Sequence, residues 1–321
     1  MKVLIIGGTG HIGSYLVPRL VLRGYEVQVL ARNPRPYYSS AGTEALWSRV
    51  EWILADRIRE EENGSWGKRM AEVEADVVID LICFTPEQNR IMVENLEGRV
   101  SHFIHCGTIW AYGPSTRVPY RENYPRRPIT EYGINKAGIE ADLLKKYDRE
   151  GFPATVIHPG HICGKKWLPI DPQGTRNGVG VYRSLARGDV VYLPDDGLAT
   201  LHHVHAEDVA QIFELAILNR KAALGESFSV AAPYAVTLSY CCEFVASLFG
   251  RKPNLRFVPL QKMLDVLGEE AFAITRDHVV HSPCVSIEKA QQLLGYWPRY
   301  TTEDIYRECI EHLLERGELI V

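Results

Sequence analysis

The chain begins with Met1-Lys2-Val3-Leu4-Ile5-Ile6-Gly7-Gly8-Thr9-Gly10-His11-Ile12-Gly13. The apolar run is too short for a helix and predicts a strand, which leads directly into three spaced glycines. From Ile12 onward, apolar residues at positions 16, 17, 20 and 21 follow the period of a helix. A strand that turns on glycines into a helix points main-chain N–H groups and the helix dipole at an anion. Because glycine leaves room for the turn and for a pyrophosphate, this stretch predicts a dinucleotide site.

The composition excludes several classes of partner. The 321 residues carry a formal net charge of −4, with acidic and basic residues mixed along the chain. We therefore expect neither a nucleic acid nor an anionic membrane as partner. No apolar stretch reaches transmembrane length, and the first one is shorter than the core of a signal peptide. The seven cysteines are irregularly spaced, with no Cys-x-x-Cys pair. They predict free thiols, a reducing compartment and hence a cytoplasmic location.

Short apolar strands alternate with helical patterns through the first half of the chain. This order predicts an α/β fold: a doubly wound parallel sheet with its site at the carboxyl ends of the strands. Residues 164–200 are rich in Gly, Pro and Asp, which is typical of a loop-dominated segment over a site. We predict a Rossmann domain of residues 1–163 with about 200–232, and a smaller C-terminal α/β substrate lobe of 164–199 and 233–321. The strands expected after the first are 26–31, 50–55, 76–83, 102–106, 154–158 and 228–231, and the helices are 87–96, 131–147, 207–218, 238–248, 288–294 and 302–316.

A candidate catalytic pair follows the fifth predicted strand. Tyr132 and Lys136 lie four residues apart at the start of a predicted helix and therefore share a face. A phenol is a poor acid or base at neutral pH, and a nearby ammonium lowers its pKa. Thr108 lies just past the fifth strand, where its hydroxyl is placed to hydrogen-bond a reacting oxygen. These three residues are the predicted catalytic set.

The order of these motifs resembles the extended short-chain dehydrogenase/reductase family, the NAD(P)-dependent epimerases and dehydratases of sugars. The resemblance covers nearly the whole chain. Its six motifs are Gly7-Gly8-Thr9-Gly10-His11-Ile12-Gly13, Cys106-Gly107-Thr108-Ile109-Trp110-Ala111-Tyr112-Gly113, Tyr132-Gly133-Ile134-Asn135-Lys136, His158-Pro159-Gly160-His161, Val204-His205-Ala206-Glu207-Asp208-Val209-Ala210 and Leu293-Leu294-Gly295-Tyr296-Trp297-Pro298.

The resemblance implies reversible hydride transfer between a nicotinamide and a carbinol or ketone carbon of a sugar or sugar-nucleotide-like substrate. By this resemblance Tyr132 exchanges the proton, Thr108 orients the oxygen, and Lys136 tunes the phenol and binds ribose. A homodimer is also implied. The cofactor-binding residues expected are Gly7, Thr9, Gly10, His11, Ile12, Gly13, Arg32, Asp56, Arg57, Leu81, Tyr132, Lys136, Pro159 and His161. The substrate-binding residues expected are Trp110, His161, Arg176 and His203.

Departures from the family pattern narrow these expectations. The second strand ends at Ala31-Arg32 without the carboxylate that holds a ribose 2′-hydroxyl, and Arg35 is near. A guanidinium there suits a 2′-phosphate, so NADP is the expected cofactor and NAD the alternative. Ile109 and Trp110 replace the Asp-Glu pair of the 4,6-dehydratases, so we do not expect that reaction.

Two further departures concern the substrate. The stretch before Val204 lacks the arginine that family epimerases offer to a diphosphate, and His161 replaces the usual asparagine. A UDP-sugar is therefore in doubt, although Arg176, Arg183 or Arg187 are available as cations. The cluster of histidines at 202, 203 and 205 raises the hypothesis of a metal site. However, adjacent strand residues point to opposite faces and no carboxylate spacing completes the set, so no metal is expected.

The sequence leaves three functions open. The leading one is an NAD(P)-dependent epimerase or oxidoreductase. The second is an NADP-dependent ketone reductase or dehydrogenase acting on a non-nucleotide substrate. The third is a non-catalytic protein that senses NADP or binds RNA, which the intact set of Thr108, Tyr132 and Lys136 argues against.

Overall fold

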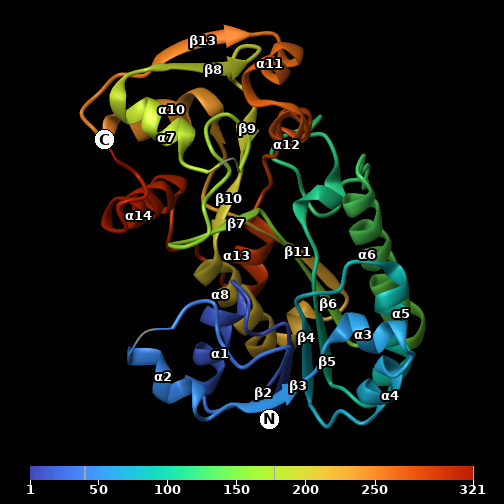
Figure 1. The fold of residues 1–321 in the computed structure, drawn as a ribbon. Helices are drawn as coiled ribbons and strands as arrows, with labels where there is room; N and C mark the ends of the chain where they lie inside the picture. Colours follow the sequence, from blue (N-terminus) through green and yellow to red (C-terminus); the bar gives the residue numbers. More distant parts are fainter. Residues whose placement is uncertain (40, 177, 321) are drawn as a thin grey trace.

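A computed structural model describes residues 1–39, 41–176 and 178–320. Its centre is a seven-stranded sheet in which every neighbouring pair is parallel (Figure 1). The strand order places the first half of the chain on both sides of β1, as doubly wound folds do. In spatial order the strands are β11 (Glu226–Val230), β6 (Ala154–Pro159), β5 (His102–Cys106), β4 (Val77–Asp80), β1 (Lys2–Ile6), β2 (Glu26–Ala31) and β3 (Glu51–Leu54).

Both faces of this sheet are buried, because successive side chains of each strand enter different cores. In β1, Val3 and Ile5 belong to one apolar cluster, whereas Leu4 and Ile6 belong to another. The first cluster packs under α1 (Gly13–Leu22), α8 (Ala206–Leu218) and α13 (Glu288–Leu294). The second packs under α4 (Trp66–Ala71), α5 (Pro86–Leu96) and α6 (Glu131–Glu150), on the opposite side of the sheet in Figure 1. The remaining helices of this region are α2 (Ala41–Trp47), α3 (Arg57–Glu62) and α9 (Arg220–Ala223), with the 3-10 turn η1 (Ile109–Tyr112).

A second lobe with its own core lies above the sheet in Figure 1. Short two-stranded sheets build it: β7 (His161–Cys163) with β10 (His203–His205), β9 (Thr200–Leu201) with β12 (Val236–Thr237), and β8 (Val190–Pro194) with β13 (Asn254–Val258). Its helices are α7 (Gly180–Arg187), α10 (Leu238–Ser247), η2 (Leu260–Lys262), α11 (Met263–Leu267), α12 (Glu269–His281) and α14 (Thr302–Glu315). The β7–β10 pair lies between the two lobes.

The predicted fold class and all the predicted strands are confirmed, most of them within one or two residues. The loop-dominated reading of residues 164–200 was wrong in part. That stretch contains α7 and β8, whose Val181, Leu185 and Leu193 are buried in the second core. Helix α13 packs with α8 in the core of the first domain, although the sequence placed all of 233–321 in the second lobe.

Candidate active site

The glycine-rich turn joins β1 to α1 with the geometry that its sequence predicted. Gly7 has a φ of +81°, and the Gly10 N–H donates to the Gly7 carbonyl at 3.1 Å. A Cβ on Gly13 would lie 2.1 Å from the Gly8 oxygen, so α1 packs on the turn only because that position is glycine. A Cβ on Gly10 would meet nothing nearer than 3.4 Å. The turn therefore leaves open space beside the N-terminus of α1, where a pyrophosphate fits.

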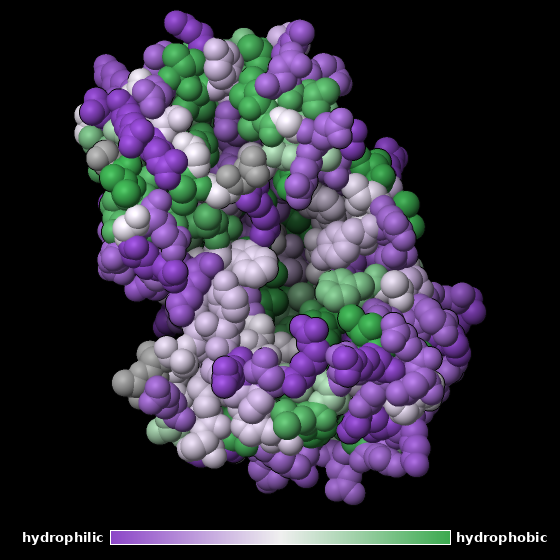
Figure 2. All heavy atoms as spheres, viewed as in Figure 1, coloured by the Kyte–Doolittle hydropathy of each residue, from purple (hydrophilic) through white to green (hydrophobic). Residues whose placement is uncertain are grey.

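A cavity of about 530 Å³ extends from this turn across the carboxyl ends of the central strands. Figure 2 shows the molecule hollowed between its two lobes, with apolar side chains gathered in the hollow. The cavity joins the residues that follow β1, β4, β5 and β6 to the first turns of α6 and to one face of α12. Its lining is Gly7, Gly10, His11, Ile12, Leu81, Ile82, Phe84, Cys106, Gly107, Thr108, Ile109, Trp110, Tyr132, Lys136, Pro159, Gly160, His161, Ile162, Trp167, Arg176, Ile274, Asp277 and His278.

The three predicted catalytic residues meet in this cavity. Thr130 caps α6 by accepting a hydrogen bond from the Gly133 N–H, which sets Tyr132 in the first turn. The Thr108 hydroxyl lies beside the Tyr132 phenol and lowers its pKa. The Lys136 ammonium lies 5.9 Å from the Tyr132 ring centroid and donates to the Cys83 and Cys106 carbonyls at 2.6 Å each. Two main-chain oxygens thus fix the lysine at the cavity floor.

The phenol is not acidified as the sequence led us to expect. Burial, followed by the neighbouring Cys106, raises the pKa of Tyr132 to about 12, against the lowering effect of the Thr108 hydroxyl. The ammonium of Lys136 is itself buried, which lowers its pKa. Its hydrogen bonds go to carbonyl oxygens rather than to the phenol. In this structure Thr108 is therefore the group that favours the phenolate.

The wall opposite the nucleotide turn is made of aromatic and imidazole rings. The His161 ring centroid is 5.0 Å from that of Trp110 and 4.7 Å from that of His278. Among the described residues, neither ring nitrogen of His161 has a hydrogen-bond partner, although the residue is buried. Burial holds the pKa of His161 well below its ordinary value, with smaller contributions from His278 and His203. This wall therefore offers a neutral imidazole that both donates and accepts.

Twelve of the predicted site residues line the cavity, and six do not. Asp56 caps α3, accepting from the Ile58 N–H at 3.1 Å. Arg57 is buried and donates to both oxygens of Asp80 at 2.8–2.9 Å. His203 is fully buried and its Nε2 lies 3.1 Å from the Ile170 carbonyl. Arg32 is exposed just after β2. Thr9 and Gly13 belong to the glycine turn and complete the six.

Sequence reasoning missed the residues that α12 contributes, which are Ile274, Asp277 and His278. No motif in the chain marks them, because only folding brings α12 over the cavity. The predicted histidines build no metal centre. Within residues 1–39, 41–176 and 178–320, no group of three His, Cys, Asp or Glu side chains is arranged to hold a metal ion. In those same ranges no helix has the length and apolarity to cross a membrane. All seven cysteines are free thiols.

A doubly wound sheet, a glycine turn for a dinucleotide and a Tyr–Lys–Thr set in one cavity define a nicotinamide-dependent oxidoreductase. Residues 3–231 match the sequence profile described as the NAD dependent epimerase/dehydratase family. The chain belongs to this family and is an NAD(P)-dependent enzyme of the epimerase and oxidoreductase type.

Three proteins with different named functions are similar to this chain in sequence. The chain is 24% identical to the 2′-dehydrokanamycin reductase of Streptomyces kanamyceticus, over 85% of this chain and 73% of that protein. It is 25% identical to the chloroplast stem-loop binding protein of 41 kDa b of Arabidopsis thaliana, over 93% of this chain and 75% of that protein. It is 24% identical to a UDP-glucose 4-epimerase of Streptococcus mutans, over 94% and 92%.

Proposed function

We propose that this enzyme transfers a hydride reversibly between a nicotinamide cofactor and a carbinol or ketone carbon of a sugar-like substrate. The observation that carries the proposal is that Thr108, Tyr132 and Lys136 converge in one cavity that also holds the glycine turn. Tyr132 takes or returns the hydroxyl proton, and Thr108 orients the reacting oxygen. The bound nicotinamide supplies or accepts the hydride.

The cavity wall supports a polyhydroxylated substrate. His161 and His278 are kept neutral by burial, which lowers the pKa of His278 to about 4. Neutral imidazoles suit hydroxyl groups, because each ring pairs one donor with one acceptor. Arg176 and Asp277 add one cation and one anion to the same cavity. Relatives named as a 2′-dehydrokanamycin reductase and a UDP-glucose 4-epimerase fit this class.

We propose NADP as the cofactor, with NAD as the alternative. Arg32 is exposed just beyond the carboxyl end of β2, beside the space where an adenosine ribose reaches in doubly wound folds. No carboxylate stands at Ala31 or Asn33 to hold a 2′-hydroxyl. A guanidinium at this place favours a 2′-phosphate. We further propose a homodimer and a cytoplasmic location, the latter supported by the free thiols.

A second candidate is a nucleotide-sensing or RNA-binding protein on the same fold. The relative named as a stem-loop binding protein favours it. The net charge of −4 and the buried, hydrogen-bonded Lys136 oppose it, since a protein that only binds needs no such phenol and ammonium pair.

One experiment separates these readings. The freshly purified protein is denatured and the nicotinamide nucleotide released is identified by mass. A near-stoichiometric nucleotide supports an epimerase that re-reduces its own substrate. An empty protein that binds NADPH supports a reductase that exchanges its cofactor.

Tyr132→Phe should keep its nucleotide affinity and lose roughly a hundredfold or more of turnover. The control Tyr240→Phe, at an exposed tyrosine, should lose neither. Failure to release or bind either nucleotide contradicts the proposal.

A further inference from the structure

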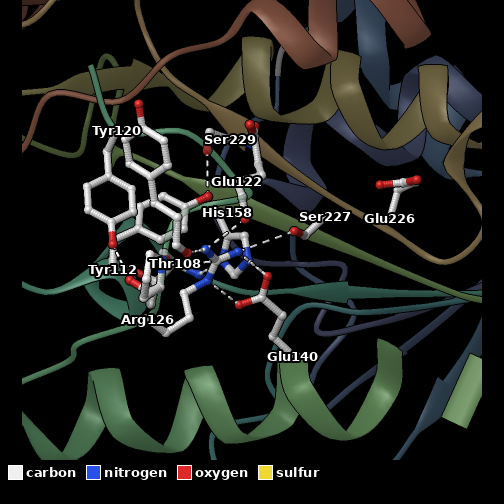
Figure 3. A network of polar contacts seen from close by, with 12 residues as sticks. Thr108, Tyr112, Tyr120, Glu122, Arg126, Glu140, His158, Glu226, Ser227 and Ser229 are labelled. Atoms are coloured by element: carbon white, nitrogen blue, oxygen red, sulfur yellow. Dashed lines mark hydrogen bonds and ion pairs between the residues drawn. The ribbon is translucent and has the colours of Figure 1, made fainter. Parts of the chain in front are cut away.

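A chain of polar groups lies next to Thr108 (Figure 3), and its members Glu140 and His158 are outside the cavity lining. Glu140 is buried and accepts two hydrogen bonds from the Arg126 guanidinium, at 2.7 and 2.5 Å. The same carboxylate lies 3.0 Å from His158 Nε2. His158 Nδ1 then lies 3.1 Å from the Thr108 nitrogen and 3.0 Å from the Thr108 oxygen. The groups therefore form one continuous path from Arg126 to the main chain of a predicted catalytic residue.

The positions of these residues follow from the elements that carry them. Tyr132, Lys136 and Glu140 are spaced by four residues on α6 and share one face of that helix. His158 belongs to β6, and Thr108 follows the neighbouring strand β5. The imidazole thus bridges the catalytic helix to the end of β5. The bridge needs close approach, since a Cβ on Gly107 would lie 2.5 Å from His158 Nδ1.

The imidazole of His158 lies between the Thr108 main chain and the Glu140 carboxylate. The Thr108 N–H lies 3.1 Å from Nδ1, and the Glu140 carboxylate lies 3.0 Å from Nε2 on the other side of the ring. Burial raises the pKa of Glu140, but His158 and Arg126 together hold it well below its ordinary value. The carboxylate is therefore charged, and each of its oxygens accepts a hydrogen bond. The other titratable groups facing His158 are Tyr112, with ring centroids 5.4 Å apart, and His105 on β5.

We propose that His158 and Glu140 are positioning residues for hydride transfer: they hold the Thr108 main chain so that its hydroxyl stays beside the Tyr132 phenol. The proposal rests on the proposed function of Thr108 and Tyr132. Neither residue touches the cavity, and both act through Thr108. A buried carboxylate is costly unless it is paired and hydrogen-bonded, as Glu140 is by Arg126. Here it serves a residue that favours the phenolate.

The matched control is a second buried carboxylate of the same kind. Glu214 on α8 is buried, accepts hydrogen bonds from Arg19 and Arg23 at 2.7–3.0 Å, and lies outside the cavity lining. Glu214→Gln therefore removes a buried carboxylate that is also paired with arginine, and it leaves the contacts of Thr108 unchanged. It reports what loss of a buried ion pair does to the protein in general.

The test reads the ionisation of the residue at position 132 without needing a substrate. Tyr132 is replaced by 3-fluorotyrosine, and its 19F signal is followed against pH in each variant. His158→Leu should raise the titration midpoint by roughly one pH unit, because it frees Thr108 from its anchor. Glu140→Gln should raise it in the same direction by less. His158→Asn should restore the midpoint, since its side-chain oxygen accepts the Thr108 N–H in place of Nδ1. Glu214→Gln should leave it unchanged.

A double variant decides whether the effect passes through Thr108. Thr108→Val by itself should raise the titration midpoint. The double variant Thr108→Val/His158→Leu should show the same midpoint as Thr108→Val. An unchanged midpoint in Glu140→Gln and His158→Leu, an equal shift in Glu214→Gln, or additive shifts in the double variant would each overturn the proposal. If His158→Leu does not fold, Glu140→Gln against Glu214→Gln still decides. These outcomes are independent of the turnover of Tyr132→Phe, so the two proposals fail separately.

Discussion

The indole of Trp110 lies flat against the imidazole of His281, with ring centroids 4.2 Å apart and planes 8° apart. This contact joins η1, which follows β5, to the end of α12 in the second lobe. This stacking therefore holds the second lobe against the domain that carries the glycine turn.

Trp110→Ala should weaken substrate binding and leave the nucleotide site intact. The aromatic pair contributes about 1 kcal/mol beyond buried area, and the indole is also part of the cavity wall. We expect the substrate KM to rise roughly tenfold, while the Kd for the nucleotide stays constant. Steady-state kinetics and nucleotide titration measure the two quantities. Trp297→Ala is the control, because that indole is 68% exposed. A parallel loss of nucleotide affinity in Trp110→Ala would contradict this assignment.

Two glycines of the nucleotide turn should respond differently to the same substitution. Gly13→Ala places a methyl group 2.1 Å from the Gly8 oxygen, so the turn must shift and unfolding free energy should fall by about 1–3 kcal/mol. Gly10→Ala meets only the Gly7 oxygen at 3.4 Å and should fold normally. Its methyl group fills the space left for a pyrophosphate, so nucleotide affinity should fall at least tenfold. Urea denaturation and nucleotide titration of both variants check this, and normal binding by Gly10→Ala would show that the phosphate lies elsewhere.

Arg32 should decide the choice between the two nicotinamide nucleotides. Arg32→Ala should weaken NADPH binding by roughly tenfold or more, because a charge-assisted hydrogen bond to the 2′-phosphate is lost. NADH affinity should change little, since NADH carries no such phosphate. Fluorescence titration with each nucleotide measures the ratio. The exposed Arg49→Ala serves as control. Equal losses for NADPH and NADH in Arg32→Ala would assign the guanidinium to the pyrophosphate instead.

Buried neutral histidines should make the fold sensitive to acid. Burial, followed by Arg220, lowers the pKa of His102 to about 3, and its Nε2 lies 2.8 Å from the Thr155 hydroxyl. As pH falls below about 6.5 the unfolded chain binds a proton at this residue and the folded chain does not, so stability is lost between about pH 6.5 and 3. This one residue should cost about 1.4 kcal/mol at about pH 5.5 relative to neutral pH.

His102→Gln should therefore reduce the difference in unfolding free energy between about pH 7.5 and 5.5 by that amount. Urea denaturation at the two pH values measures the difference, and the amide can still reach the Thr155 hydroxyl. The same difference in the variant and in the original protein would show that His102 is protonated in the folded state as well.

Much of the nucleotide domain was predictable because its signals are local. Strand β5 is a short buried run of five residues with no helical period, and it was predicted with its exact bounds. The pair Tyr132 and Lys136 follows from helix geometry alone. In the second lobe α7 was not predicted, because the surrounding residues 164–200 are rich in Gly, Pro and Asp, which is typical of a loop.

The sequence by itself determined the doubly wound sheet, the glycine turn and the catalytic set, because strand and helix periods and turn chemistry act over a few residues. Only the tertiary structure decided what surrounds that set. It committed Arg57 to Asp80 rather than to the cofactor, brought α12 over the cavity, and placed His158 and Glu140 next to Thr108. The side-chain contacts among these residues join positions that lie 18 to 50 residues apart, and their partners are chosen by burial and charge pairing, for which the linear chain carries no spacing rule.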